Sequence, residues 1–445
     1  MFLSIKTPVP NDIPLELPLP EWLLVVLLIV SFLAHIVFVN VMVGGSILTL
    51  WGQIKGLKNK DYDVFAHEVA KTITVNKSIA VVLGVAPLLC INTLYTVYFY
   101  SANALTGLMW ILIIPLVTIA FLLTYLHKYT WERLEDNKWL HISIMGLSVA
   151  LFLFIPLIFL VNVNLMLFPE KWQSIQGFLS ALTLPNVLPR YFHFLCSSLA
   201  VTGLFVVWYN KRKNYPVEEI YTSLTRYGLK RIGYNLALGA SVAQFLIGPI
   251  VAVSLPAKGY SWGLFIPILC GVAVAVLAVR WLWKAVTGPK EDIDKNFGKI
   301  VLALTITVVF MGSGRHMYRA TALAPHQKLV AAKTKEFQRL SEEARTNAAN
   351  AKPVELVTDP SLGEVAKGAA IFKQNCTSCH KEREKLVGPP MTEMVSIYEN
   401  DPEGLKKWIN APGKKRADFP QMPAFAQLSD DDLTELSKYI LSIKK

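Results

Sequence analysis

The sequence predicts an all-α protein in which an eight-helix transmembrane bundle precedes a small water-soluble helical domain. Hydrophobic residues make up 53% of the 445 residues and charged residues only 17%, which is too apolar for a soluble globule. The apolar residues gather in eight runs of about 20 or more residues, the length that a helix needs to cross a bilayer. After residue 323 the chain turns polar, and no further run of that length follows.

A proline-rich segment of 20 residues precedes the expected spans, and Lys6 is its only base. It lacks the pattern of a secretory signal peptide, so we expect it to be retained on the outer side of the membrane. The expected spans are Glu21–Trp51, Ser78–Ser101, Leu105–His127, Leu140–Leu167, Tyr191–Asn210, Tyr234–Leu255, Leu264–Trp283 and Phe297–Arg319.

Basic residues are unevenly distributed between the two sides of this bundle. The segments that follow spans 1, 3, 5 and 7 hold eighteen lysines and arginines, whereas the other side holds six up to the end of span 8. By the positive-inside rule the basic loops are cytoplasmic and both chain ends are periplasmic. The net charge of +12 therefore reflects membrane topology and not a nucleic-acid partner, since residues 360–445 carry 13 basic and 12 acidic side chains.

The composition divides the chain into three parts: the bundle at 1–323, a linker at 324–359 and a final domain at 360–445. Within the linker, Lys333–Arg345 is rich in Lys, Glu, Gln and Ala, which favours a solvated helical spacer before an irregular stretch. In the final domain, Ser429 before three aspartates predicts a capped last helix. That helix is expected to bury Leu433, Leu436, Tyr439 and Ile440.

The final domain contains a motif for covalent cofactor attachment. Cys376, Cys379 and His380 stand in the order C-x-x-C-H, in which two thiols add to the vinyl groups of one c-type haem and the histidine reaches its iron. Met422 is the expected second iron ligand. A zinc or thiol-redox site would need a second C-x-x-C or a βαβ pattern, and the sequence has neither. Haem c is attached on the outer side of bacterial membranes, which agrees with the predicted topology.

Histidines inside the apolar runs are candidate ligands of non-covalent haem, because ionisable residues in a bilayer are costly. His35 lies roughly 22 Å along the first span at 1.5 Å per residue. His193 and His316 lie at the outer ends of the fifth and eighth spans and can together hold one b-type haem, with Met311 or Met317 as rival second ligands. The alternative is interfacial histidines that bond to backbone carbonyls.

The segment around His316 offers further haem contacts. The small residues Gly312–Gly314 would let a porphyrin approach the backbone, and Arg315 or Arg319 would meet its propionates. We expect no ligand role for the four histidines in polar or interfacial segments, and a packing role for the three isolated cysteines: His67, His127, His141, His326, Cys90, Cys196 and Cys270.

The membrane half, over roughly residues 20–255, resembles the quinol-oxidising subunit I of cytochrome bd oxidases. The resemblance is carried by Ala34–Val39 with a glycine pair after it, by Phe192-His193-Phe194 with Val201-Thr202-Gly203 behind it, and by Leu160–Asn164. It implies that His35 ligates a haem of the oxygen-reducing pair and that His193 ligates a low-potential haem b beside a quinol site. The final domain is similar to class I cytochromes c through Val387–Pro390, Trp408 and Met422-Pro423.

The membrane half also departs from that family. Leu105–Leu123 contains no acidic residue where the oxidases carry glutamates that serve oxygen reduction. The long quinol-binding loop after span 6 is replaced by Pro256–Trp262, and the Gly-Arg-Gln-Pro-Trp motif is absent, although Arg315 offers another arginine on that side. Electron transfer is therefore expected more strongly than oxygen reduction.

The sequence thus predicts a multihaem electron-transfer subunit of an oxidoreductase in the bacterial inner membrane. It would move electrons between one or two haems b, exchanging with the quinone pool, and one periplasmic haem c, in contact with other respiratory-complex subunits and periplasmic cytochromes. Two alternatives stay open. One is a bd-type terminal oxidase subunit fed through its fused haem c, and the other is a non-redox membrane anchor for a cytochrome c.

Overall fold

The computed structural model describes residues 17–350, 360–414 and 419–443, and all regular structure within them is helical. Among these residues, seven helices are long and apolar enough to cross a membrane, and a bent pair makes up to eight. The all-α prediction with a multi-spanning bundle is confirmed. The predictions for residues 1–16 and for the end of the linker, 351–359, lie outside the described residues.

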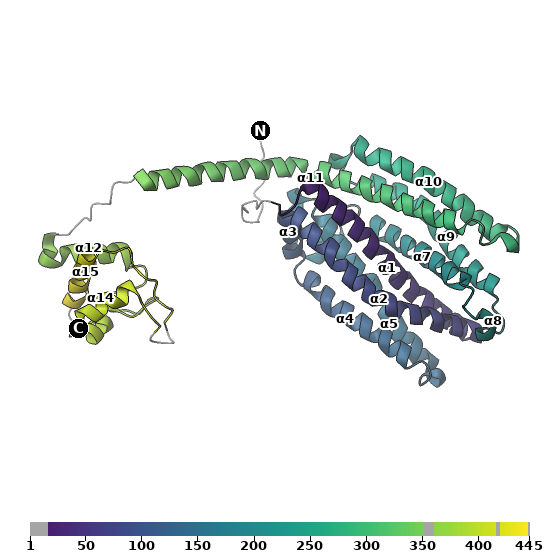
Figure 1. The fold of residues 1–445 in the computed structure, drawn as a ribbon, viewed down its shortest axis with the longest axis horizontal. Helices are drawn as coiled ribbons and strands as arrows, with labels where there is room; N and C mark the ends of the chain where they lie inside the picture. Colours follow the sequence, from purple (N-terminus) through teal and green to yellow (C-terminus); the bar gives the residue numbers. More distant parts are fainter. Residues whose placement is uncertain (1–16, 351–359, 415–418, 444–445) are drawn as a thin grey trace. The chain divides into compact units, whose positions relative to one another are not determined.

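The bundle consists of long, roughly aligned helices joined by short segments (Figure 1). The long helices are α1 (Glu21–Gly56), α2 (Lys60–Leu94), α3 (Thr96–Thr106), α4 (Leu108–Tyr129), α5 (Lys138–Leu165), α7 (Val187–Lys211), α9 (Arg226–Val253), α10 (Trp262–Thr287) and α11 (Phe297–Asn350). The short elements are η1 (Glu135–Asn137), η2 (Pro169–Ser174), α6 (Phe178–Leu182), α8 (Val217–Ile220), η3 (Ala257–Gly259) and η4 (Lys290–Asp292).

The second and eighth spans differ most from their expected bounds. The second expected span begins much earlier, because α2 starts at Lys60 and bends by 42° between its halves Lys60–Ile73 and Ser78–Leu94. The eighth does not stop at Arg319, because α11 continues as one helix to Asn350. Ala, Lys, Glu and Gln are strong helix formers, so the polar sequence after the apolar run extends the helix instead of ending it.

Small residues allow a close contact between the backbones of α7 and α9. A Cβ atom added at Gly203 would lie 2.4 Å from the carbonyl oxygen of Gly233, and one added at Gly233 would lie 2.5 Å from that of Gly203. In a lipid environment helices gain little from hydrophobic burial against one another, so close backbone packing of this kind supplies the attraction.

The remaining chain forms a separate compact unit, Gln338–Lys445, distinct from Met1–Phe337. Its elements after the linker are η5 (Pro360–Val365), α12 (Ala366–Asn375), α13 (Met391–Tyr398), α14 (Pro402–Asn410) and α15 (Asp430–Ser442). Ser429 caps α15 as expected, because its Oγ accepts a hydrogen bond from the backbone N–H of Asp432 at 3.1 Å. Three of the four residues expected inside are buried, and Tyr439 is half-buried.

Candidate functional site

The C-x-x-C-H motif forms one tight turn directly after α12. The backbone N–H of Cys379 and that of His380 both donate to the carbonyl of Cys376, at 3.1 and 2.9 Å. Both cysteines are half-buried and unpaired, and His380 is buried. The turn therefore holds two thiols and an imidazole on five consecutive residues, next to the core of the C-terminal unit.

The ring of His380 is held in one orientation. Its Nδ1 lies 2.8 Å from the carbonyl oxygen of Pro389, and because a carbonyl can only accept, Nδ1 carries the proton. The lone pair of Nε2 then remains for a metal, which is the arrangement that metal-bound histidines usually show. Gly388 makes room for the ring, since a Cβ there would lie 2.3 Å from Cε1 of His380.

The thiols of this motif do not form a metal site of their own. Burial, with a smaller contribution from the neighbouring Cys379, raises the pKa of the Cys376 thiol to about 11, so this thiol is protonated at neutral pH. Among the described residues no group of three or more His, Cys, Asp or Glu side chains is arranged to hold a metal ion. The donor set fits thioether attachment better than zinc binding.

Met422 lies in an extended segment beside the same core. Its side chain is half-buried and packs against the cluster that Cys376 and Trp408 also contact. The segment is tied down by the backbone N–H of Phe425, which donates to the carbonyl of Ile409 at 3.2 Å. No described hydrogen bond engages the sulfur of Met422, so this thioether is available as an iron ligand.

His35 has the same ring arrangement as His380, inside the membrane bundle. Its Nδ1 donates to the carbonyl of Ala80 on α2, at 2.8 Å, which leaves Nε2 without the proton. The half-buried ring fits against α2 only because residue 84 is glycine: a Cβ there would lie 2.9 Å from Cε1 of His35. A bond to a backbone carbonyl is what the alternative without a haem predicts. The same bond also leaves Nε2 free to bind iron.

His193 lies on α7 and uses only its backbone in the described contacts. Its carbonyl accepts from Ser197 Oγ at 3.2 Å, and Ser197 in turn accepts from Gln244 of α9 at 2.6 Å. No hydrogen bond of the described residues involves its ring, which is half-buried. Both ring nitrogens are thus uncommitted, and no described contact joins this ring to that of His316.

An arginine cluster lies near His316, on which the charges of Arg319 and Glu21 both act, at the end of the bundle opposite the basic loops. We use this name for Arg190 of α7 with Arg315 and Arg319 of α11, whose charges lie close enough to act on one another. Nη1 of Arg190, Nε and Nη2 of Arg315 and Nδ1 of His316 are all buried without a hydrogen-bond partner.

Aromatic rings position two of these guanidinium groups. Arg315 lies 5.3 Å from the ring centroid of Tyr318, and Arg319 lies 5.0 Å from that of Tyr95. No ion pair of the described residues involves a member of the arginine cluster. Such a concentration of buried, unpaired positive charge is unfavourable unless an anion accompanies it.

The structure places three of the four histidines for which no ligand role is expected. His326 belongs to α11, where its Nδ1 is hydrogen-bonded to the hydroxyl of Tyr98 at 3.0 Å beside the buried Trp172. His127 and His141 are not at a wet interface but are 1% and 0% exposed. Their shared partner Gln53 lies 74 and 88 residues away, and Arg190 meets Arg315 from another helix, so the sequence did not bring these residues together. The available signal was a pair of histidines at the two ends of the 127–141 connection.

Comparisons with known proteins follow the division into two units. Residues 365–444 match the family model described as Cytochrome c. The curated relatives include cytochrome c oxidase subunit 2 of Bacillus sp. (strain PS3), 28% identical over 106 residues that make up 21% of this chain and 28% of that protein. They also include cytochrome c6 of Cyanidioschyzon merolae, 27% identical over 82 residues, which are 18% of this chain and 77% of that protein. The chain thus spans 28% of the length of the first of these relatives.

The bundle is similar to the solved structure of bd oxidase from Geobacillus thermodenitrificans. The match covers 73% of this chain and 96% of that chain, with a TM-score of 0.53 and 14% sequence identity. At this identity the match shows a shared fold. The protein is therefore a multi-pass membrane protein in which a bundle with the bd oxidase fold is joined to a cytochrome c domain, and that domain implies a covalent haem c.

Proposed function

We propose that the protein is a membrane-anchored multihaem cytochrome. It transfers electrons between haem b in the bundle, in exchange with the quinone pool, and haem c in the C-terminal domain. It acts as a subunit of a respiratory complex in the bacterial inner membrane, with both chain ends on the periplasmic side. The fold of the bundle and the fused cytochrome c domain support electron transfer in general, and the arginine cluster supports this specific form.

The arginine cluster carries the proposal. Burying an ion without a partner costs several kcal/mol even after relaxation, and here Arg190 and Arg315 each leave guanidinium nitrogens buried and unpaired. The ligand that the cluster requires is anionic and lies beside a histidine whose Nδ1 is buried and unpartnered, at His316. A haem b meets both requirements, because its propionates are carboxylates and its iron takes an imidazole.

The residues that would hold the haems follow from these geometries. His380 and Met422 would ligate the haem c bound to Cys376 and Cys379. His193 and His316 would hold the haem b near the arginine cluster, and His35 would hold a second through Nε2. Haem iron supplies one-electron transfer when it is bound, and the protein sets its distance, potential and exposure to water.

The domain arrangement suits this role. We propose 1–323 as the haem b bundle, 324–359 as the polar linker and 360–445 as the haem c domain. The helical continuation of α11 past Arg319 makes the linker a stiff spacer over its described part. The cytochrome domain would then exchange electrons with the bundle or with periplasmic cytochromes on the same side of the membrane.

Oxygen reduction is the second candidate function, because the bundle shares the fold of a bd oxidase chain. Against it, α4 runs from Leu108 to Tyr129 without an acidic residue. An oxygen-uptake assay with a reduced c-type donor separates the two functions. Cyanide-sensitive or bd-like oxygen turnover by the purified protein supports the oxidase and opposes a pure transfer role.

Anaerobic stopped-flow spectroscopy tests the leading proposal. A short-chain quinol is mixed with the oxidised full-length protein, and the b-type and c-type optical bands are followed separately. We expect haem b to be reduced first and haem c afterwards. His193→Leu should abolish quinol-driven reduction of haem c while dithionite still reduces it. Equal quinol-driven rates in wild type and His193→Leu would contradict the proposal.

A further inference from the structure

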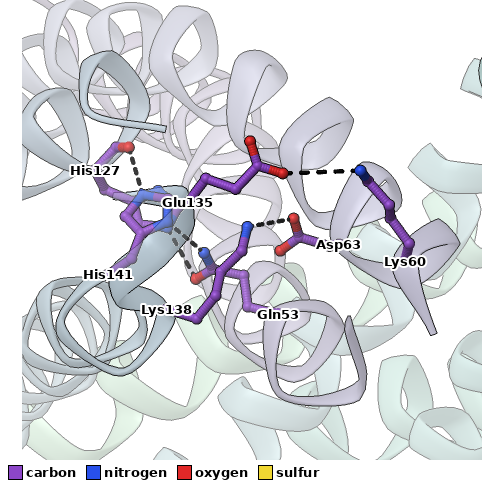
Figure 2. A network of polar contacts seen from close by, with 7 residues as sticks. All are labelled: Gln53, Lys60, Asp63, His127, Glu135, Lys138 and His141. Carbon is purple, nitrogen blue, oxygen red and sulfur yellow. Dashed lines mark hydrogen bonds and ion pairs between the residues drawn. The ribbon is translucent and has the colours of Figure 1, made fainter. Parts of the chain in front are cut away.

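A buried polar network joins three helices at the basic-loop end of the bundle (Figure 2). Gln53 of α1 lies between His127 of α4 and His141 of α5, and all three side chains are at most 1% exposed. His127 Nε2 and Gln53 Oε1 are 2.9 Å apart, and Gln53 Nε2 and His141 Nδ1 are 3.0 Å apart. His141 Nε2 lies 2.7 Å from the carbonyl oxygen of His127. We call Gln53, His127 and His141 the inner triad.

The hydrogen bonds of the inner triad fix His141 in the neutral form and fix one proton on Nε2 of His127. The His127 carbonyl can only accept, so His141 carries its proton on Nε2 and accepts from the Gln53 amide at Nδ1. The Gln53 oxygen then faces His127 and accepts its Nε2 proton. Every polar atom between the rings is paired, and the one ring nitrogen outside these bonds is Nδ1 of His127, which no hydrogen bond of the described residues involves.

This pattern selects where a proton can bind. A proton added at His127 Nδ1 breaks no hydrogen bond, whereas one added at His141 Nδ1 would face the donating Gln53 amide. The two rings are stacked with centroids 4.1 Å apart, so two positive charges would repel strongly. The inner triad therefore accepts one proton, at His127.

Charged and titratable groups surround the inner triad on the side of the basic loops. His67 of α2 stacks on Trp131 at 4.3 Å, and Trp131 contacts both triad histidines edge-on. Lys138 of α5 pairs with Asp63 of α2 at 2.7 Å, and Lys60 pairs with Glu135 at 3.8 Å. The remaining neighbours, Glu68 and Lys71, act on His67 and pair with each other at 2.6 Å. Each of these three ion pairs is neutral, so a proton added to the inner triad adds one positive charge that none of the pairs cancels.

Buried hydroxyls continue from the inner triad along α1. Thr49 lies one helical turn from Gln53 and Ser46 almost one turn further, and both are 0% exposed. Thr49 Oγ1 is buried without a hydrogen-bond partner. An unsatisfied hydroxyl in a membrane bundle is costly, so a proton-carrying partner such as water is expected there. His35 lies further along the same helix.

We propose that the inner triad is a proton-loading site that takes one proton from the basic-loop side and passes it along Thr49 and Ser46 toward the half of the bundle that holds His35. A hydronium ion gives its proton to the Nδ1 lone pair of His127, forming imidazolium and water. The imidazolium then releases one proton to the water expected beside Thr49, which restores the neutral ring, and each hydroxyl or water along the path passes on one proton for each proton that it accepts. We expect this uptake to accompany electron entry from quinol, which rests on the proposed function, whereas protonation of the triad does not.

Infrared difference spectroscopy of the purified full chain, at pH values stepped from about 4 to 8, tests protonation directly. With ¹⁵N-labelled histidine we expect one imidazole of the inner triad to titrate, and we expect His127→Asn to remove the infrared band of that imidazole. Gln53→Glu keeps the side-chain volume but places a carboxylate between the rings, so the band should persist to higher pH. His326→Gln, at a separate site, should leave the imidazole band of the inner triad unchanged. If that band does not titrate, or if it survives His127→Asn, the proton-loading site is overturned.

Proton uptake in reconstituted vesicles tests the path. A pH indicator in the compartment that faces the basic loops is followed while quinol reduces the protein, and haem b is quantified in the same sample. We expect uptake that slows at least tenfold in Thr49→Val, and no slowing in Thr118→Val, whose hydroxyl is exposed and bonded within α4. Equal uptake rates in wild type and Thr49→Val overturn the path. Absence of haem b instead overturns the proposed function and leaves the infrared result to decide the triad.

Discussion

The imidazole of His35 on α1 donates its Nδ1 proton to the carbonyl oxygen of Ala80 on α2, and the two atoms are 2.8 Å apart. His380 makes the same bond to Pro389, also at 2.8 Å, in the cytochrome c domain. In both units a backbone carbonyl fixes the tautomer that leaves Nε2 for a metal, and in both a glycine lies against the ring, Gly84 and Gly388. The recurrence of one arrangement at two histidines is what makes His35 the better-prepared ligand of the bundle.

Replacing Gly84 with alanine should displace this ring. The new Cβ would lie 2.9 Å from Cε1 of His35, closer than carbon atoms approach without a shift. Overpacking of this kind costs about 1–3 kcal/mol, so we expect the haem b content per chain to fall while haem c is unchanged. Gly146→Ala is the control, because its Cβ would enter open space. Equal haem b content in both variants argues against His35 as a ligand.

Removing a positive charge from the arginine cluster should weaken haem b binding in the haem-containing protein but stabilise the haem-free protein. Arg190→Met removes a charge-assisted hydrogen bond to a propionate, worth about 1.5–3 kcal/mol, so haem b should be lost roughly tenfold more readily. The same change relieves a buried unpaired charge in haem-free protein and should raise its unfolding temperature. Haem retention and thermal unfolding are measured beside Arg280→Met, an exposed arginine. A shift of both quantities in the same direction would count against an anionic ligand.

Replacing Met422 with alanine should lower the reduction potential of haem c. Loss of a thioether ligand leaves a harder sixth ligand or an open position, which favours ferric iron. A drop on the order of a tenth of a volt is expected, within the about 0.8 V over which axial ligands set haem potentials. Met394→Ala is the matched control, since Met394 packs against the same core. A potential that stays constant in Met422→Ala, measured by optical redox titration, refutes the ligand assignment.

The capping pair of α15 gives the cytochrome domain a defined acid sensitivity. The Ser429 hydroxyl donates to Asp432 at 2.7 Å and Lys367 lies 3.0 Å away, and together they hold the pKa of Asp432 below its usual range. The stabilisation is complete above the unfolded-state pKa of about 3.9 and is lost as the pH falls through the lower folded-state value.

Asp432→Asn should therefore destabilise this domain by about 0.5–1 kcal/mol at pH 7, a figure kept small because the pair is largely solvated. It should also flatten the fall in stability below about pH 4. Denaturant unfolding followed by haem absorbance measures both, with Asp431→Asn as the control in the same first turn. A variant that keeps the wild-type acid slope would show that other carboxyl groups dominate.

The sequence predicted the parts of the molecule whose cause is local. The spans follow from long continuous apolar runs, and the haem c motif follows from the five consecutive residues Cys376 to His380. Both can be recognised without knowing any contact between distant residues. It misplaced the start of α2, and it did not predict that α11 runs without a break from the last span into the helix expected at Lys333–Arg345.

Contacts between distant segments could not be predicted from one sequence. Gln53 meets His127 and His141 across 74 and 88 residues, and Arg190 joins Arg315 from another helix. Which face of an apolar helix turns inward is not encoded by periodicity when all faces are hydrophobic, as in α4. The inner triad and the arginine cluster therefore become visible only once the helices are packed.

Haem quantification on the purified full-length protein tests the central claim most directly. Pyridine haemochrome spectra, before and after acid-acetone extraction, separate covalent haem c from extractable haem b. The account predicts one haem c per chain together with at least one extractable haem b, which His193→Leu reduces. One haem c with no extractable haem b would contradict it and leave a membrane anchor that carries a cytochrome c.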